Sequence, residues 1–387
     1  MGTADSHAAG FDAARLAHLD DAIAADVAAE RYDGCELVVA RHGAVAYRAQ
    51  HGFADRAAGT RVAPGQLFVT MSIGKQLTVA LVLRAVERGY FALTTPVADL
   101  IPAFATRGKA RVTVGHLLTH TGGMPAMLPA GLAPEQVGNL EAVVAATCES
   151  LLECRPGTRV VYSVIVGHAV LAELVRRADG GGRSYGRILR EDLFEPLGMR
   201  DTWLGKPAHV AARLAPVVAR DRRPGLFDPA FMEAIGAMVG EDSEIPAGGY
   251  VSSAPDMHRF AEMLRRGGEL DGVRILSPGT VALVQENRTG DEVNTLWAYA
   301  EAMRGWPPIP ADLGYGFFLR GTGSHPTPFG QMASPRTFGG FGAGSSAFWI
   351  DPATDVTYAF LSSGLMEDSY SIERHQRLAD IVHAALT

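Results

Sequence analysis

The sequence is poor in cysteine and has no long hydrophobic run. Its three cysteines, Cys35, Cys148 and Cys154, are too few and too irregularly spaced for a disulfide framework, and none forms a C-x-x-C pair. The amino terminus lacks a cationic segment followed by an apolar one, and no stretch of about 18 apolar residues occurs. These absences exclude a disulfide-stapled module and a membrane-spanning helix. We expect a cytoplasmic protein with no membrane partner.

Positive charge is also scarce. The 42 acidic residues outnumber the 35 basic ones, and the net charge of −7 argues against a broad basic surface for nucleic acid or anionic lipid. Only Lys75, Lys109 and Lys206 are lysine. What the chain does have is 47% hydrophobic and 20% charged residues, the balance of a folded protein, and 387 residues are enough for two domains or one large composite domain.

Hydrophobic periodicity predicts an α+β protein. Helical spacing indicates a helix over 11–30, and two β-rich runs, 36–40 and 44–50, are joined by a short connection in which Gly43 can take a positive φ. Another helix begins at Ser72 and ends at Gly89. Further helices are expected over 114–119, 140–152, 164–178, 185–193 and 254–266.

The carboxyl-terminal part of the sequence returns to strands. We expect loops over 290–335, strands over 344–350 and 356–362, and a closing helix over 372–386. Strands near both ends with helices between them predict one antiparallel sheet built from both termini. We therefore expect an α/β domain from 1–68 and 246–387, a mainly helical domain from 69–245, and an active site in the cleft between them.

Ser72 and Lys75 form an S-x-x-K motif at the predicted start of a helix. Their spacing places both side chains on one helix face, one turn apart. A lysine withdrawn from water can have its pKa lowered enough to take the serine proton. Backbone N–H groups at the helix start could also stabilise an oxyanion. The alternative is an ordinary helix-terminal serine beside a solvated lysine.

Two further motifs could supply chemistry. Tyr162 precedes a predicted helix, and a tyrosine near an ammonium group can act as a general acid or base because the ammonium favours the phenolate. The glycine-rich segment 339–344 leads into the expected strand 345–350, where absent side chains would let a substrate approach the backbone. Each motif also has a purely structural interpretation, a buried tyrosine in one case and a flexible strand start in the other.

Taken together, these motifs resemble those of the serine β-lactamase and penicillin-binding-protein superfamily. The sequence is most similar to its class C-like branch, which contains family VIII carboxylesterases and lovastatin-type acyltransferases. The resemblance extends over nearly the whole chain and is carried as well by His116–Pro125, Leu193–Met199, Pro246–Asp256 and Gly314–Gly316. It implies a β-lactamase-like fold.

The resemblance also implies roles for individual residues. Ser72 would be the nucleophile, Lys75 its proton partner, and Tyr162 the second base that protonates the leaving group. The N–H groups of Ser72 and Ala343 would form the oxyanion hole. No metal or cofactor is implied.

The sequence departs from the β-lactamase pattern at two positions. Val164 stands where the tyrosine motif usually ends in asparagine, and Gly340 stands where a cation usually begins the strand motif. Without these two polar groups, a tightly selected anionic amide is a poor substrate. With Phe341 and Gly342, these two positions would border an uncharged small-molecule ester.

The sequence therefore predicts a serine carboxylesterase. An acyltransferase that passes the acyl group to an alcohol is the closest alternative, followed by a weak β-lactamase or peptidase and, remotely, by an inactive binding protein on this fold. His116 and His120, four residues apart, could share a metal, but no third ligand with suitable spacing is found and a structural role is expected. The natural substrate and the oligomeric state stay open.

Overall fold

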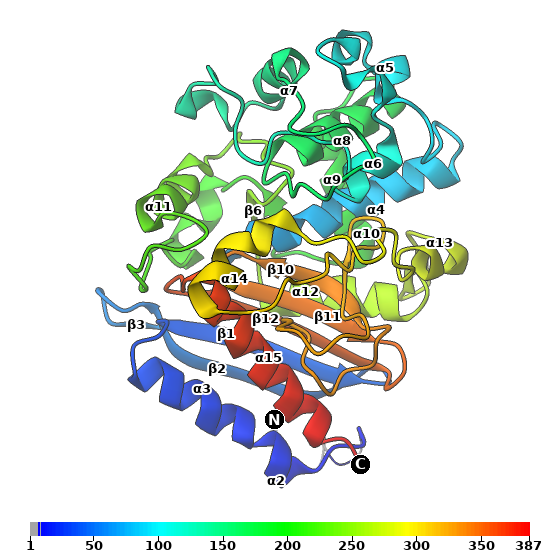
Figure 1. Ribbon diagram of the computed structural model, residues 1–387. Helices are drawn as coiled ribbons and strands as arrows, with labels where there is room; N and C mark the ends of the chain where they lie inside the picture. Colours follow the sequence, from blue (N-terminus) through cyan, green and yellow to red (C-terminus); the bar gives the residue numbers. More distant parts are fainter. Residues whose placement is uncertain (1–6, 8) are drawn as a thin grey trace.

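The computed structural model describes His7 and residues 9–387. Within this part of the chain, seven antiparallel strands form the main sheet in the order β3-β2-β1-β12-β11-β10-β9 (Figure 1). The strands are β1 (Gly34–Arg41), β2 (Ala44–Asp55), β3 (Thr60–Arg61), β9 (Phe318–Leu319), β10 (Phe338–Gly342), β11 (Ser346–Asp351) and β12 (Val356–Ser363). Strand β1 pairs with β12, so the sheet is assembled from both ends of the chain, as predicted.

Helices cover both faces of this sheet. In Figure 1, α15 (Asp368–Ala384) and α3 (His18–Ala28) lie in front of it, and α12 (Ala254–Arg265) lies behind it. Successive residues of β1 alternate between two cores because strand side chains point to opposite faces. Leu37 packs in the core that contains residues of α3 and α15, and Val38 packs in the core that contains Phe260 of α12.

The middle of the chain is mainly helical, as the periodicity predicted. It forms the upper part of the molecule in Figure 1, where α4 passes beneath α8. Its helices are α4 (Gly74–Glu87), α5 (Val97–Leu100), α6 (Val114–Leu118), α7 (Leu140–Glu149), α8 (Val166–Ala178), α9 (Tyr185–Leu189), α10 (Glu195–Leu197) and α11 (Pro229–Met238). A small second sheet, in the order β4-β6-β5, joins this part to the rest through β4 (Phe68–Val69), β5 (Trp203–Leu204) and β6 (Tyr250–Ser252).

Several elements differ from the expected ones. The first helix is divided into α2 (Ala13–Leu16) and α3, and the stretch expected to be loops over 290–335 contains α14 (Ala298–Arg304) and β9. The glycine-rich segment does not merely lead into a strand, because most of it is itself strand β10. A Cβ on Gly339 would lie 2.1 Å from the carbonyl oxygen of Phe348, so β10 and β11 approach too closely for a side chain there.

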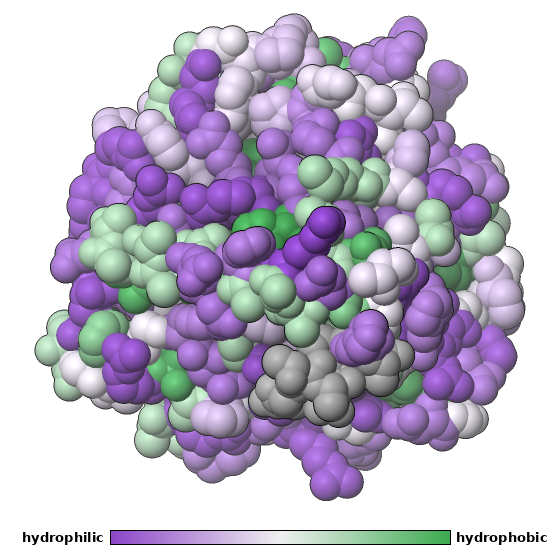
Figure 2. All heavy atoms as spheres, turned by 90° about the horizontal axis from the view of Figure 1, so that it is seen from below, coloured by the Kyte–Doolittle hydropathy of each residue, from purple (hydrophilic) through white to green (hydrophobic). Residues whose placement is uncertain are grey.

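The surface seen from below carries mostly hydrophilic side chains (Figure 2). Hydrophobic side chains on this face form several separate groups, the usual pattern for a folded chain whose large apolar residues are mainly enclosed. None of the helices in the described residues combines the length and apolar character needed to cross a membrane.

Candidate active site

Ser72 lies in a single 3-10 turn, Met71–Ile73, that connects β4 to α4. Met71 has a φ of 53°, in the left-handed region that non-glycine residues rarely adopt. Packing on the turn holds this conformation: the Ser346 hydroxyl donates to the Thr70 carbonyl oxygen at 2.6 Å, and a Cβ on Gly248 would lie 2.8 Å from the Met71 oxygen. The contacts of Ser346 and Gly248 with this strained turn therefore fix the orientation of Ser72.

Lys75 lies in the first turn of α4 and is almost wholly buried. Its Nζ is 3.1 Å from Ser72 Oγ, 2.8 Å from the Val164 carbonyl oxygen and 3.0 Å from the Ala247 carbonyl oxygen. A neutral amine has two N–H groups and one lone pair. The two carbonyls accept those N–H groups, which leaves the lone pair for the Ser72 hydroxyl proton.

Burial lowers the pKa of Lys75 from its ordinary value to about 7. The cause is loss of hydration, which penalises the charged ammonium more than the neutral amine. A large fraction of Lys75 is therefore neutral near pH 7. The expectation that S-x-x-K brings a serine together with a lysine able to take its proton agrees with this geometry.

Tyr162 is buried beside Ser72 and Lys75. Its ring stacks on the His120 ring at 4.3 Å between centroids, and Lys75 Nζ is 5.1 Å from the centre of the tyrosine ring. Burial raises the pKa of Tyr162 above its ordinary value, and a hydrogen bond with Ser72 only partly opposes that rise. The structure therefore disagrees with the expectation that a nearby ammonium favours the phenolate, because burial dominates and disfavours both charges. At neutral pH Tyr162 is a phenol and can donate a proton.

His116 and His120 make separate structural contacts. The His116 ring accepts a hydrogen bond from the Thr113 N–H at 3.2 Å and so caps α6. His120 Nδ1 accepts from the Ser163 N–H at 3.0 Å, and burial lowers the pKa of His120 to about 3, so its ring is neutral. His120 therefore packs against the Tyr162 ring and helps to position it. The sequence alone did not reveal this contact.

A cavity opens in front of Ser72. The cavity itself is small, about 40 Å³, and reaches about 410 Å³ only when the open solvent at its mouth is counted; Ser72, Val164 and Ala343 all border it. The remaining lining is Met71, Ile165, Phe227, Met232, Ile235, Ile245, Ala247 and Gly248. Ser72 and Ala343, the two residues expected to supply oxyanion N–H groups, thus face the same space. Apart from Ser72, nearly all the side chains around it are apolar.

The other three residues expected to contact substrate do not line this cavity. In the described structure, Gly340, Phe341 and Gly342 are absent from the lining of this cavity. A Cβ on Gly340 would lie 2.2 Å from the side-chain oxygen of Gln76, so Gln76 occupies the space that a side chain at position 340 would need. Phe341 packs on Trp297 at 5.4 Å between ring centroids. Both residues are thus packed into the interior and do not border this space.

Sequence reasoning missed Gln76 and the apolar residues of 227–245. Gln76 follows the S-x-x-K lysine directly, and its amide donates to the Gly316 carbonyl oxygen at 2.8 Å. Phe227 and the α11 residues Met232 and Ile235 carry no recognisable motif. The only available signal was their apolar character over a short helical stretch, which is equally typical of ordinary core.

A family comparison agrees with this geometry. The family model described as Beta-lactamase matches residues 19–383. The chain belongs to the beta-lactamase family. Both the expected superfamily and the expected α+β fold are thereby confirmed.

Individual relatives of this beta-lactamase-family chain include proteins named as esterases. It is 28% identical over 380 residues to the esterase/beta-lactamase LipL of Mycobacterium tuberculosis, covering 91% of this chain and 82% of LipL. It is 34% identical over 214 residues to esterase EstB of Burkholderia gladioli, covering 51% of this chain and 54% of EstB.

The fold is also shared with solved structures. A penicillin-binding protein homologue from Caulobacter crescentus superposes with a TM-score of 0.80 and 26% identity, covering 96% of this chain and 98% of the homologue. The family therefore includes both esterase-named and penicillin-binding members, and the site must decide between their activities.

Proposed function

We propose that this protein is a serine hydrolase that cleaves an uncharged carboxylic ester through an acyl-enzyme on Ser72. The observation that carries the proposal is the buried Lys75, whose amine lies 3.1 Å from Ser72 Oγ at the edge of an apolar cavity. The names of LipL and EstB support an ester as the substrate class.

The reaction begins with attack by Ser72 Oγ on the ester carbonyl carbon, while Lys75 takes the hydroxyl proton. The negative charge that develops on the carbonyl oxygen is stabilised by the N–H groups of Ser72 and Ala343. Collapse of this intermediate breaks the bond to the alcohol, and Tyr162 donates the proton that the leaving oxygen requires. Water then attacks the acyl carbon while the Tyr162 phenolate takes a proton from it, and Lys75 returns its proton to Ser72 Oγ as the carboxylic acid leaves.

The polarity of the cavity supports an uncharged acyl group. Val164 borders it in place of an asparagine, and no cationic side chain is among its lining residues in the described structure. The space at Gly340 is taken by the side chain of Gln76, which is neutral and does not replace the missing cation. A charged substrate would lose its hydration without gaining partners, which disfavours anionic amides relative to neutral esters.

A panel of p-nitrophenyl esters of increasing acyl length tests this proposal. We expect hydrolysis of short neutral esters, and we expect Ser72→Ala to abolish it while thermal unfolding is unchanged. A phosphonate reagent should label Ser72, as read by peptide mass. Labelling of a different serine, or full activity in Ser72→Ala, would refute the proposed nucleophile.

Adding an alcohol to the same assay separates a hydrolase from an acyltransferase. The acyl-enzyme partitions between water and the alcohol according to which attacks faster. We expect the free acid to predominate over the new ester at millimolar alcohol. Predominance of the new ester would instead assign the protein to the acyltransferases.

A further inference from the structure

A second cavity, of about 590 Å³, lies between the end of α3 and the first turns of α15. Its volume is within the range of small-molecule binding sites. In the described structure, none of its lining residues also borders the cavity in front of Ser72. It is therefore a separate space to which the proposed esterase reaction assigns no role.

The lining of this cavity is rich in arginine. Five arginines border it, Arg31, Arg220, Arg223, Arg374 and Arg377, against only three acids, Glu30, Asp221 and Glu373. Two more acids, Asp26 and Asp33, pair with Arg31, Arg377 and Arg220 from outside the lining, so most of this positive charge is balanced. What distinguishes the cavity is its concentration of guanidinium groups, which bind carboxylates and phosphates through paired hydrogen bonds.

Arg374 strengthens the case because its charge has no acidic partner in the described structure. It is 2% exposed, and its hydrogen bonds go to neutral groups. These groups are the carbonyl oxygens of Gly344 and Ser345, the hydroxyls of Ser362 and Ser371, and the ring of His375. Burying a cation without a counter-charge is costly, so an anion in the adjoining cavity would lower that cost.

Two of the arginines that line the cavity have N–H donors beyond those used by their acid partners. Arg31 pairs with Asp26 at 3.2 Å through one guanidinium nitrogen only, and the side chain of Arg31 is 57% exposed. Arg220 is 30% exposed; it pairs with Asp33 through two nitrogens, at 2.8 and 2.9 Å, and its third nitrogen is 3.6 Å from Glu30. Each guanidinium has five N–H donors, more than these contacts use.

The cavity also has an aromatic wall. Tyr370 borders it, and the Arg223 guanidinium lies 3.7 Å from the centre of the Tyr370 ring. The Arg304 guanidinium also lies 4.1 Å from the centre of this ring, so two cation–π contacts hold the aromatic ring in the cavity wall. The combination suits a small organic molecule more than a bare inorganic ion.

We propose that the arginine-lined cavity binds a small organic anion whose carboxylate or phosphate group is held by Arg31 and Arg220. Arg374 supplies long-range positive charge, and Tyr370 contacts the organic part. Arg374 also hydrogen-bonds the Ser345 carbonyl oxygen at 3.1 Å, two residues after Ala343. The cavity is thus linked through one side chain to the turn that carries the proposed oxyanion N–H.

Calorimetric titration with succinate and, separately, with phenyl phosphate tests this site at constant ionic strength. We expect saturable one-to-one binding of at least one probe, and the stronger probe identifies the anionic group. Arg31→Gln combined with Arg220→Gln should weaken binding at least about tenfold. These two changes leave Asp26 with Arg377 and Asp33 with Arg56, so neither buried acid loses its last arginine.

Arg56→Gln is the matched control, because Arg56 also pairs with Asp33, at 2.7 Å, but does not line the cavity. We expect Arg56→Gln and Ser72→Ala each to bind the probe with an affinity within about twofold of that of the wild type. Equal weakening in Arg56→Gln, or loss of binding in Ser72→Ala, would overturn the assignment. So would the absence of binding by either probe up to about 20 mM.

A footprint on the unmodified protein gives a second readout if the double variant does not fold. Phenylglyoxal modifies accessible arginines, and a bound anion should slow modification of Arg31 and Arg220 severalfold by peptide mass. Arg190, which is 56% exposed and remote from the cavity lining, is the internal control. If a saturating probe left the modification rate of Arg31 and Arg220 unchanged, the proposal would also be overturned.

Discussion

Lys75 and Tyr162 show how burial alone sets the charge state of a site. Both side chains are enclosed, and loss of hydration lowers the lysine pKa while it raises the tyrosine pKa. Each group is therefore driven toward its neutral form, one as a proton acceptor and the other as a proton donor. This division suits a reaction in which a proton is removed from Ser72 and another is delivered to the leaving alcohol.

Substitution of these two residues tests whether they act as a unit. We expect Lys75→Ala and Tyr162→Phe each to lower kcat by about 10² to 10⁴, and the double variant to lose little more than either single one. The reason is that removal of one proton partner already disables the shared step. Steady-state kinetics on an ester of a simple alcohol measures this, because p-nitrophenolate leaves without needing a proton. Losses that multiply fully in the double variant would indicate independent roles.

The pH dependence of kcat/KM tests the lysine assignment. Lys75 must be neutral to accept the proton, so activity should rise as pH increases through about 7, the lowered pKa of Lys75, and level off above it. A profile of kcat/KM between about pH 5.5 and 9 measures this. A flat profile would contradict a role for the neutral amine.

Asp368 provides the necessary control for that profile. Burial raises the pKa of this carboxyl to about 7 as well, and Asp368 accepts a hydrogen bond from the Gly344 N–H at 3.0 Å, next to Ala343. We expect Asp368→Asn to keep the inflection near pH 7, because Lys75 is unchanged. Disappearance of the inflection in Asp368→Asn would transfer it from Lys75 to Asp368.

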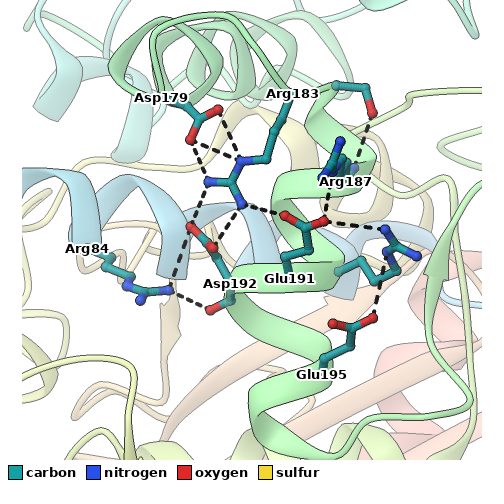
Figure 3. A network of polar contacts seen from close by, with 9 residues as sticks. Arg84, Asp179, Arg183, Arg187, Glu191, Asp192 and Glu195 are labelled. Carbon is teal, nitrogen blue, oxygen red and sulfur yellow. Dashed lines mark hydrogen bonds and ion pairs between the residues drawn. The ribbon is translucent and has the colours of Figure 1, made fainter.

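At the scale of elements, a network of charged side chains fastens the helix that carries Lys75 to its neighbours (Figure 3). Arg183 lies at its centre and pairs with Asp179 after α8, with Glu191 at 3.0 Å and with Asp192 at 3.1 Å. Asp192 in turn faces Arg84 of α4, at 3.9 Å. Arg183 thus joins the end of α8 to the segment 190–194, and Asp192 extends the network to α4.

We expect Arg183→Gln to lower the free energy of unfolding by about 1 kcal/mol. A single partly exposed ion pair contributes little to stability, but this substitution removes three of them at once. Arg183 lowers the pKa of Asp179, so the stabilisation is present above the ordinary carboxyl pKa and is lost as pH falls through the lowered one. Urea unfolding at pH 7 and pH 3 measures both effects, and the difference from wild type should shrink at pH 3.

Arg190→Gln is the matched control for this network. Arg190 is 56% exposed and makes two long contacts, with Glu191 at 3.5 Å and with Glu195 at 3.8 Å, so its removal should change stability by less than about 0.5 kcal/mol. If both variants lost the same free energy of unfolding, Arg183 would stabilise the protein no more than an exposed arginine at the edge of the network.

At the scale of the whole molecule, the cavity in front of Ser72 is assembled from distant parts of the chain. Ser72, Val164, the α11 residues Met232 and Ile235, and Ala343 meet only because both sheets and the helices between them are packed together. The resulting space is apolar throughout most of its lining. Its selectivity is consequently a property of the assembled fold and not of any one motif.

This assembly predicts a preference between two substrates. We expect kcat/KM for a short neutral p-nitrophenyl ester to exceed that for nitrocefin by at least about a hundredfold, because two polar partners of a charged amide are missing. Each forgone hydrogen bond to a charged group is worth roughly 1.5 to 3 kcal/mol. Parallel initial-rate assays measure the ratio. Comparable values would favour a β-lactamase over an esterase.

The sequence by itself determined the sheet built from both termini, the helical middle, the Ser72–Lys75 spacing and the family resemblance. These features depend on hydrophobic periodicity and short motifs, which act over a few neighbouring residues. Strand β10 was less visible because its glycines have no strand propensity of their own. It forms by pairing with β11, and glycine at position 339 permits the close approach of the two backbones.

Only the tertiary structure decided which groups are buried and which segments meet. It moved Gly340 and Phe341 away from the cavity in front of Ser72, brought α11 to it, and kept Tyr162 a phenol by enclosing it. It also gathered arginines from α15 and from two separate loops around a second cavity. Burial and long-range contact depend on the packing of the whole chain, and no local pattern of residues encodes them.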